Sequence, residues 1–136
     1  MNENKHLKDY KLQLEMQTRW RDLDAFGHVN NAVFASYIEN ARATLFDRWK
    51  LPYLGKGKSL IIASLTIDYY KQLNHPSKFI IGQKVSRIGN TSFDIQSSLF
   101  KENKLICTSR VVVVCFDFDI QKPIPVFKEI IEDSKL

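Results

Sequence analysis

The sequence predicts an α+β domain in which one long apolar helix is enclosed against an antiparallel β-sheet. Three observations favour this fold class. Apolar and polar residues alternate over 10–20, an apolar stretch of helical length covers 32–49, and four strand-like segments follow from residue 59 onward. Consecutive strands joined by short turns form antiparallel sheets, and an apolar helix must pack on one face of such a sheet. The 136 residues have the length of one domain, which we take as 1–136.

The first strand is predicted over 10–20, because a period of two is typical of a strand with one buried face. A polar turn over 22–31 follows. Asn30 or Asn31 is suited to cap the next helix, since an amide side chain accepts from first-turn N–H groups. The helix is predicted from about residue 32 to 49 and is apolar around much of its circumference, which indicates enclosure. It is expected to end at Leu51-Pro52, because proline disfavours a helical residue before it.

The remaining strands are predicted over 59–71, 78–88, 91–101 and 105–118, with turn signals between them. The last of these contains the apolar run 111–116, which is typical of a central strand buried on both faces. Cys107 and Cys115 lie on one face of that strand, too far apart to bond, and are expected to be reduced core residues. A short terminal helix is predicted over 126–131, with Pro125 near its first position.

Composition and charge exclude several classes of function. No run approaches the roughly 20 apolar residues that span a bilayer, and the first ten residues lack the apolar core of a secretory signal. We therefore expect a cytoplasmic protein with no membrane association. The net charge of +5 favours an anionic partner. No nucleic-acid partner is expected, because the basic residues are scattered and are not interleaved with aromatic side chains.

The turn over 22–31 gathers the polar groups that suggest chemistry. Immediately before a predicted helix stand two carboxylates, a glycine, a histidine and two asparagines, at Asp22, Asp24, Gly27, His28, Asn30 and Asn31. A helix start offers free N–H groups and a partial positive charge. A carboxylate beside such donors suits acyl chemistry, in which an oxyanion is stabilised next to a base or nucleophile. A metal is not expected, because the three histidines show no ligand spacing.

These residues form the pattern D-x-D-x-x-G-H-V-N-N, and the helix behind them carries Glu39 and Arg42 as E-x-x-R. The pattern resembles the hotdog-fold acyl-CoA thioesterases of the 4-hydroxybenzoyl-CoA thioesterase type, and the later segments 67–71, 87–93 and 122–125 fall in that family's order. The resemblance implies a hotdog fold, with the antiparallel sheet wrapped around the long helix. It also implies an acyl-CoA substrate, no cofactor, and a homodimer that assembles into a homotetramer with active sites at the dimer interface.

The resemblance assigns roles within the turn. Asp24 would attack the thioester carbon or activate a water, and the backbone amide of Asn31 would polarise the carbonyl. Gly27 would let the backbone turn sharply. His28 is implicated only by similarity to acyl carrier protein thioesterases, which have an asparagine where this chain has Phe26. The alternative for His28 is that it fixes the turn by hydrogen bonds.

The substrate is expected to contact residues outside the turn. Arg87, Asn90, Thr91 and Ser92 match the family region that binds the nucleotide end of coenzyme A, and arginine and hydroxyl groups suit phosphate oxygens. An ordinary hairpin turn is the alternative there.

The acyl pocket is expected to include Tyr37, near Val33 and Phe34, and the loop 53–58 is expected to gate it. Glu39 is expected to be a buried carboxylate with a supporting role, partnered by Arg42 or by a backbone group of the other subunit.

Two further functions stay open. One is hydrolysis of acyl carrier protein thioesters, whose acidic carrier would meet the basic surface. The other is a non-catalytic hotdog module that binds acyl-CoA as a regulatory ligand. The intact Asp24 argues against the second.

Overall fold

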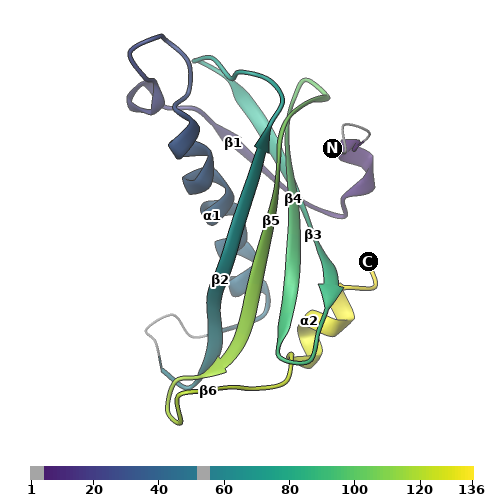
Figure 1. Cartoon of the computed structure of the whole chain (residues 1–136). Helices are drawn as coiled ribbons and strands as arrows, with labels where there is room; N and C mark the ends of the chain where they lie inside the picture. Colours follow the sequence, from purple (N-terminus) through teal and green to yellow (C-terminus); the bar gives the residue numbers. More distant parts are fainter. Residues whose placement is uncertain (1–4, 52–55) are drawn as a thin grey trace.

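In the computed structural model, which describes residues 5–51 and 56–136, one long helix lies in the curve of an antiparallel sheet (Figure 1). The helix α1 covers Asn31–Arg48. The strands are β1 (Leu12–Gln17), β2 (Lys58–Tyr69), β3 (Lys78–Ile88), β4 (Ser92–Lys101), β5 (Lys104–Asp117) and β6 (Lys122–Pro123). Short 3-10 helices cover Leu7–Asp9 and Trp20–Asp22, and α2 covers Lys128–Asp133.

Among the described residues the sheet has six strands. Five follow the order β1-β3-β4-β5-β2, and the sixth, β6, pairs with the C-terminal end of β5. Every pair is antiparallel. The strands β1 and β2 stand at the two ends of the order and therefore form the edges of the sheet. The predicted α+β class and the hotdog fold are therefore confirmed. In the same described ranges, no helix is both long and apolar enough to cross a membrane.

The first strand is shorter than its alternation predicts. It ends at Gln17, because the chain then leaves the sheet and forms a 3-10 turn in which the Asp22 carboxylate accepts from the Arg19 backbone N–H. The prediction of a half-buried strand out to Trp20 is wrong, since this side chain is 79% exposed. Tyr10 is buried as predicted, but it precedes the strand and packs on the sheet from outside.

The other elements agree with the predicted bounds to within two residues. Asn30 is the N-cap of α1, and its side chain accepts from the Ala32 N–H at 2.9 Å. The terminal helix begins at Lys128, because Phe127 is its N-cap. Pro125 therefore precedes the helix, and its predicted place near the first helical position is wrong. The pair β5–β6 was not predicted, since a two-residue strand is too short to show a periodicity.

The core lies between α1 and the concave face of the sheet. Phe34, Tyr37, Ile38, Ala41 and Leu45 share one side of α1 and are each less than 5% exposed. They contact inward side chains of β3, β4 and β5 in two adjoining clusters. Cys107 and Cys115 are free and belong to these clusters. Burial raises the pKa of Cys107 to about 12, so this thiol stays protonated.

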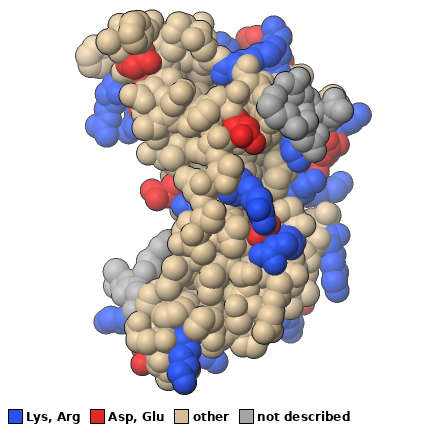
Figure 2. All heavy atoms as spheres, viewed as in Figure 1, with Lys and Arg blue, Asp and Glu red and all other residues tan. Residues whose placement is uncertain are grey.

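The strand β2 has an open edge, since among the described residues it pairs only with β5. Four of its apolar or aromatic side chains are 37–43% exposed, at Ile61, Ile62, Leu65 and Tyr69. Figure 2 shows that the face of the molecule over β2 and β5 carries few charged side chains, with one group of basic and acidic atoms in its middle. An exposed apolar edge strand is a template for pairing with another chain.

The N-terminal segment is fixed to the outer face of the sheet by Tyr10. Its ring lies on Gly82 of β3, where an added Cβ would overlap the Cβ, Cγ and Cδ2 atoms of Tyr10. Its hydroxyl is 2.6 Å from Gln96 Oε1 and 2.5 Å from Ser98 Oγ. The ring is also covered by the Lys84 ammonium group, 5.4 Å from its centroid. A glycine is therefore required at position 82 to admit the tyrosine.

Candidate active site

The turn before α1 is closed by backbone hydrogen bonds. The Asp24 N–H donates to the His28 carbonyl at 2.8 Å, and the Gly27 N–H donates to the Asp24 carbonyl at 3.2 Å. The Val29 N–H then donates to the Leu73 carbonyl at 2.8 Å, which ties the turn to the segment after β2. Gly27 has φ of +84°, a left-handed conformation that glycine adopts without a Cβ clash. Its predicted role in a sharp turn agrees with this geometry.

The carboxylate of Asp24 is half-buried at the surface of this turn. Its Oδ1 accepts from the Phe26 N–H at 2.8 Å and, more weakly, from the His28 N–H at 3.4 Å. Both donors within the described ranges thus bind Oδ1, which leaves Oδ2 able to accept from a water or a substrate in the pocket that Asp24 lines. The geometry is therefore compatible with two roles for Asp24, as a residue that stabilises the turn and as a reactive carboxylate.

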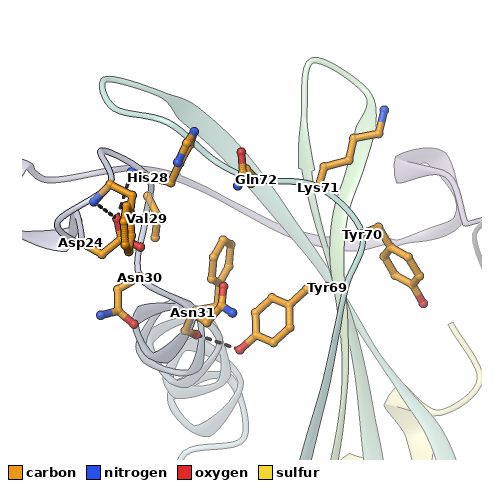
Figure 3. Close-up of a pocket in the computed structure, with 11 residues that line it drawn as sticks. Asp24, His28, Val29, Asn30, Asn31, Tyr69, Tyr70, Lys71 and Gln72 are labelled. Atoms are coloured by element: carbon orange, nitrogen blue, oxygen red, sulfur yellow. Dashed lines mark hydrogen bonds between the residues drawn. The ribbon is translucent and has the colours of Figure 1, made fainter.

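The start of α1 lies beside this carboxylate (Figure 3). Asn31 is the first helical residue, and its N–H is one of the first-turn amides that have no partner within the helix. Its carbonyl accepts from the Tyr69 hydroxyl at 2.8 Å. Burial raises the pKa of Tyr69, so the phenol keeps its proton and remains a donor. The end of β2 therefore holds the helix start in place.

A pocket of about 610 Å³ opens between the turn, the first turn of α1 and the end of β2. It is lined by Asp24, Phe26, residues 28–31, Phe34 and residues 69–72. The rings of Phe34 and Tyr69 meet edge to face, with centroids 5.5 Å apart, and form an apolar wall. The four catalytic candidates, Asp24, Gly27, His28 and Asn31, thus belong to one turn at one pocket.

Tyr69, Tyr70 and Gln72 were not among the predicted site residues. The place of segment 69–72 beside the helix start follows from the curl of the sheet, which no local pattern shows. The residues 53–55 of the loop that we expected to gate the pocket lie outside the described ranges. His28 lies at the pocket rim, and its backbone forms a bridge with Asn74.

Two predicted site residues on α1 point elsewhere. The side chain of Glu39 is 76% exposed, so the expectation of a buried carboxylate is wrong for this chain. Position 39 lies on the outward side of α1, whereas Arg42 is buried and stands 3.9 Å from Glu39. The hydroxyl of Tyr37 donates to the Asp22 carboxylate, and this side chain does not line the pocket at the turn. Contact of either residue with substrate stays a prediction.

The predicted nucleotide-binding residues lie at the opposite end of the sheet. Ser92 pairs with Val114, which pairs with Ile61 of β2. Tyr69, at the pocket, is eight positions further along β2, which corresponds to roughly 27 Å of strand. One chain therefore does not bring the segment 87–92 to its own pocket.

The backbone of this segment is used within the fold. The Thr91 carbonyl accepts from the Cys115 N–H, and the Asn90 carbonyl accepts from the Val126 N–H. Arg87 donates to Ser92 Oγ at 3.0 Å and forms an ion pair with Asp94 at 2.9 Å. Arg110 binds the other carboxylate oxygen at 2.7 Å. Two guanidinium groups therefore flank one buried carboxylate on the outer face of the sheet.

Stability should depend on pH through Asp94. Burial alone would raise the pKa of this carboxyl group, but the hydrogen bonds and charges of Arg87 and Arg110 outweigh burial and lower it. A lowered pKa contributes stability that is present above the unfolded value of 3.8 and is lost as pH falls through the folded value.

Asp94→Asn is therefore expected to lower the free energy of unfolding at pH 7. The gap between variant and wild type should close as pH falls below about 4, because only the wild type loses this contribution. Urea denaturation from pH 7 to pH 2 measures both curves. A gap of constant size over that range would contradict the assignment.

An antiparallel sheet around one long helix, with a carboxylate turn at the start of that helix, is the arrangement that the resemblance to hotdog-fold thioesterases predicts. The family model of the thioesterase-like superfamily matches residues 18–133, and the chain belongs to that superfamily. Among the described residues, no group of three or more histidine, cysteine or acidic side chains is arranged to hold a metal ion.

Comparison with known proteins places this chain near several relatives. It is 29% identical over 92 residues to the acyl-acyl carrier protein thioesterase ATL2 of Arabidopsis thaliana, a match that covers 65% of this chain and 49% of the relative. The chain thus spans about half the length of the curated relatives it matches.

Two solved structures are similar over nearly the whole fold. The PA5185 protein of Pseudomonas aeruginosa strain PAO1 gives a TM-score of 0.85 at 26% identity, covering 96% of this chain and 93% of that one. A thioesterase of Thermus thermophilus, complexed with coenzyme A and Zn, gives 0.80 at 27% identity, covering 93% and 99%.

Proposed function

We propose that this protein hydrolyses an acyl-CoA thioester to a free acid and coenzyme A, with Asp24 as general base or nucleophile. The observation that carries the proposal is the meeting of one carboxylate and one helix N-terminus at a single pocket. The Thermus thermophilus relative, a thioesterase complexed with coenzyme A, supports coenzyme A as the acyl carrier.

With Asp24 as a base, the carboxylate takes a proton from a water whose oxygen attacks the thioester carbonyl carbon. The carbonyl electron pair moves to oxygen, and the Asn31 N–H donates to that oxyanion. When the C=O bond re-forms, the C–S bond breaks, and the sulfur leaves with the electron pair and takes the proton. With Asp24 as a nucleophile, a carboxylate oxygen attacks instead, the C–S bond breaks, and coenzyme A leaves as the thiolate with the electron pair. Water then hydrolyses the resulting anhydride, which releases the free acid, restores the Asp24 carboxylate and supplies the proton that the thiolate takes.

The test is a substrate profile. Purified protein is incubated with short, long, branched and aromatic acyl-CoAs, and a thiol reagent reports the released coenzyme A. Turnover of at least one class is expected, with an acyl preference set by the Phe34–Tyr69 wall. Release no faster than that of a heat-denatured sample across the whole panel would remove the proposal.

Hydrolysis of acyl carrier protein thioesters is the second candidate. The similarity to the Arabidopsis thaliana enzymes and the net charge of +5 favour it. An acidic carrier would be attracted over a large surface, so its rate should fall steeply with salt, while acyl-CoA rates change less. Equal rates and equal salt dependence for matched acyl groups would exclude a carrier preference. Binding of acyl-CoA without turnover would instead favour the non-catalytic module.

We also propose that two chains pair through their β2 edges, in a homodimer that assembles further into a homotetramer. The open, apolar edge of β2 supports this pairing. In an antiparallel pair centred on β2, the start of one strand lies opposite the end of the other. The segment 87–92 of the second copy would then lie about three strand spacings, roughly 15 Å, from Tyr69. Such a dimer reconciles the predicted nucleotide-binding residues with the pocket.

Leu65→Lys is expected to break this dimer, because Leu65 is 43% exposed on β2 and a charge at a buried interface is costly. Sedimentation equilibrium should show that the dissociation constant of the dimer rises roughly tenfold or more, which is equivalent to about 1.4 kcal/mol. The matched control is Ile120→Lys, which alters a side chain 58% exposed in the turn after β5. An unchanged mass for both variants would place the interface elsewhere.

A further inference from the structure

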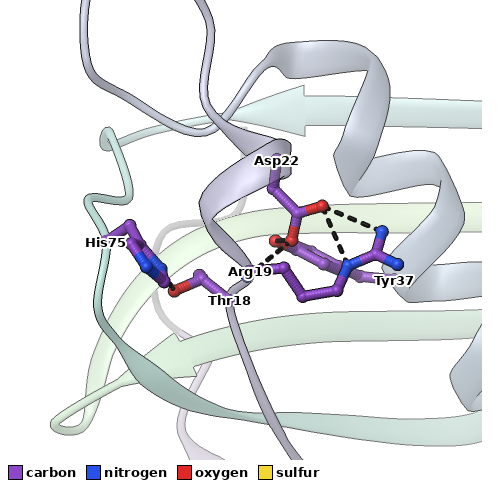
Figure 4. Close-up of polar contacts among 5 residues, drawn as sticks. All are labelled: Thr18, Arg19, Asp22, Tyr37 and His75. Carbon is purple, nitrogen blue, oxygen red and sulfur yellow. Dashed lines mark hydrogen bonds and ion pairs between the residues drawn. The ribbon is translucent and has the colours of Figure 1, made fainter.

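Asp22 is a carboxylate that the proposed reaction does not use, yet it is only 1% exposed. Its Oδ1 accepts from Arg19 Nε at 3.1 Å and Nη2 at 2.9 Å, and its Oδ2 accepts from the Arg19 backbone N–H at 2.9 Å. The Tyr37 hydroxyl donates to the same Oδ2 at 2.5 Å (Figure 4). The carboxylate thus has four donors from two side chains and one backbone amide.

The pKa shifts of Asp22 and Tyr37 run in opposite directions. Burial alone would raise the pKa of Asp22, but the hydrogen bonds from Tyr37 and Arg19 outweigh burial and lower it. Burial and the neighbouring carboxylate raise the pKa of Tyr37 well above its usual range. The phenol therefore stays protonated and the carboxylate stays charged near neutral pH, so the donor and acceptor roles do not change.

The cluster connects three parts of the chain that must keep a fixed relation. Arg19 follows β1, Asp22 begins the turn over 22–31, and Tyr37 lies on α1, six residues after Asn31. The Asp22 carbonyl also accepts from the Asn30 N–H at 2.9 Å, at the other end of the turn. Both ends of the turn and the helix behind it are thereby joined at one residue.

We propose that Tyr37, Asp22 and Arg19 form a positioning network that sets the distance between the Asp24 carboxylate and the Asn31 amide. The proposal rests on the proposed hydrolysis and gives Tyr37 a role away from the substrate. A displacement of about 1 Å between reacting groups is enough to cost on the order of 100-fold in rate. Loss of the Tyr37 hydroxyl relaxes one of the bonds that prevent such a displacement.

The test compares Tyr37→Phe with Tyr10→Phe. Each variant removes one phenolic hydroxyl from a buried tyrosine with a short hydrogen bond, but Tyr10 lies on the outer face of the sheet, away from the pocket. Both variants should lose a similar amount of thermal stability. Tyr37→Phe is expected to lower kcat about tenfold with KM within about twofold of wild type, whereas Tyr10→Phe should leave both unchanged.

A second variant tests whether the residues act together. Arg19→Gln should also lower kcat, and the double variant Tyr37→Phe/Arg19→Gln should lose less than the product of the two single effects, because residues in one network are not additive. Independent multiplication of the two effects, or an equal loss of kcat in Tyr10→Phe, would overturn the proposal.

Hydrogen exchange makes the test independent of turnover. Amides of the segment 23–31 should exchange roughly fivefold or more faster in Tyr37→Phe than in wild type or Tyr10→Phe. Unchanged exchange in this segment overturns the positioning role whether or not the wild type hydrolyses thioesters. A wild type without turnover, combined with faster exchange in Tyr37→Phe, removes the proposed hydrolysis and leaves the network intact.

Discussion

Asp24→Asn is expected to lower kcat for acyl-CoA hydrolysis by about 10²- to 10⁴-fold, because an amide can neither accept the proton of the attacking water nor attack the thioester. The amide keeps the size of the side chain and an oxygen that can accept from the Phe26 N–H, so the turn should persist. Binding of the substrate should therefore change little. Coenzyme A release under saturating substrate measures kcat, and calorimetric titration of a non-hydrolysable thioether analogue measures binding.

The control for this prediction is Glu129→Gln, which makes the same chemical change on the exposed side of α2. It should hydrolyse at the wild-type rate. An Asp24→Asn variant that is as fast as the control would assign Asp24 to the structure of the turn. Loss of both turnover and analogue binding would mean that the substitution had disrupted the pocket.

Gly82→Ala is expected to lower the free energy of unfolding by about 2–3 kcal/mol, a large effect for one methyl group. The new Cβ would overlap the ring of Tyr10, which is backed by Phe100 and cannot stay in place. The cost is bounded by that of removing the ring altogether, since Tyr10 can leave its site. Urea denaturation with a common m-value measures the change.

A double-mutant cycle isolates the cause. In a Tyr10→Ala background, Gly82→Ala should cost less than about 0.5 kcal/mol, because the ring that it meets is absent. Ser86→Ala, an exposed change on the same strand, is the control and should be near neutral. An equal cost of Gly82→Ala in both backgrounds would show that the alanine disrupts β3 itself.

Elements with a strong period were predictable from this sequence, because one buried face imposes its spacing over many residues. The helix predicted over 32–49 is Asn31–Arg48, and the valine-rich strand lies inside the sheet as expected. Its predicted burial on both faces is wrong, because Val112 and Val114 on the outer face are only half-buried. The prediction that the first strand reaches Trp20 is wrong, because the apolar–polar alternation continues for three residues after the chain has left the sheet. The departure depends on Asp22, whose carboxylate accepts from the Arg19 N–H inside a local turn and from the Tyr37 hydroxyl in a tertiary contact.

The candidate site was predictable only where it is contiguous in sequence. Residues 24–31 could be assigned to one turn, since a local motif specifies local geometry. The segment 69–72 could not, because its approach to α1 depends on the curvature of the whole sheet. The bond from Tyr37 to Asp22 could not be predicted either, because helical spacing locates a side chain on a face of α1 without showing what it meets.

The pocket draws its polar groups and its apolar wall from two segments that are far apart in the sequence. The turn and the start of α1 carry the carboxylate and the amide, while Tyr69 of β2 supplies the ring that closes the wall against Phe34. If the proposed hydrolysis holds, natural variation at the end of β2 can alter which acyl groups fit without touching Asp24 or the Asn31 amide. A lineage with this architecture could then diversify its substrates by exchanging side chains in one short stretch, while the proposed chemistry is inherited unchanged.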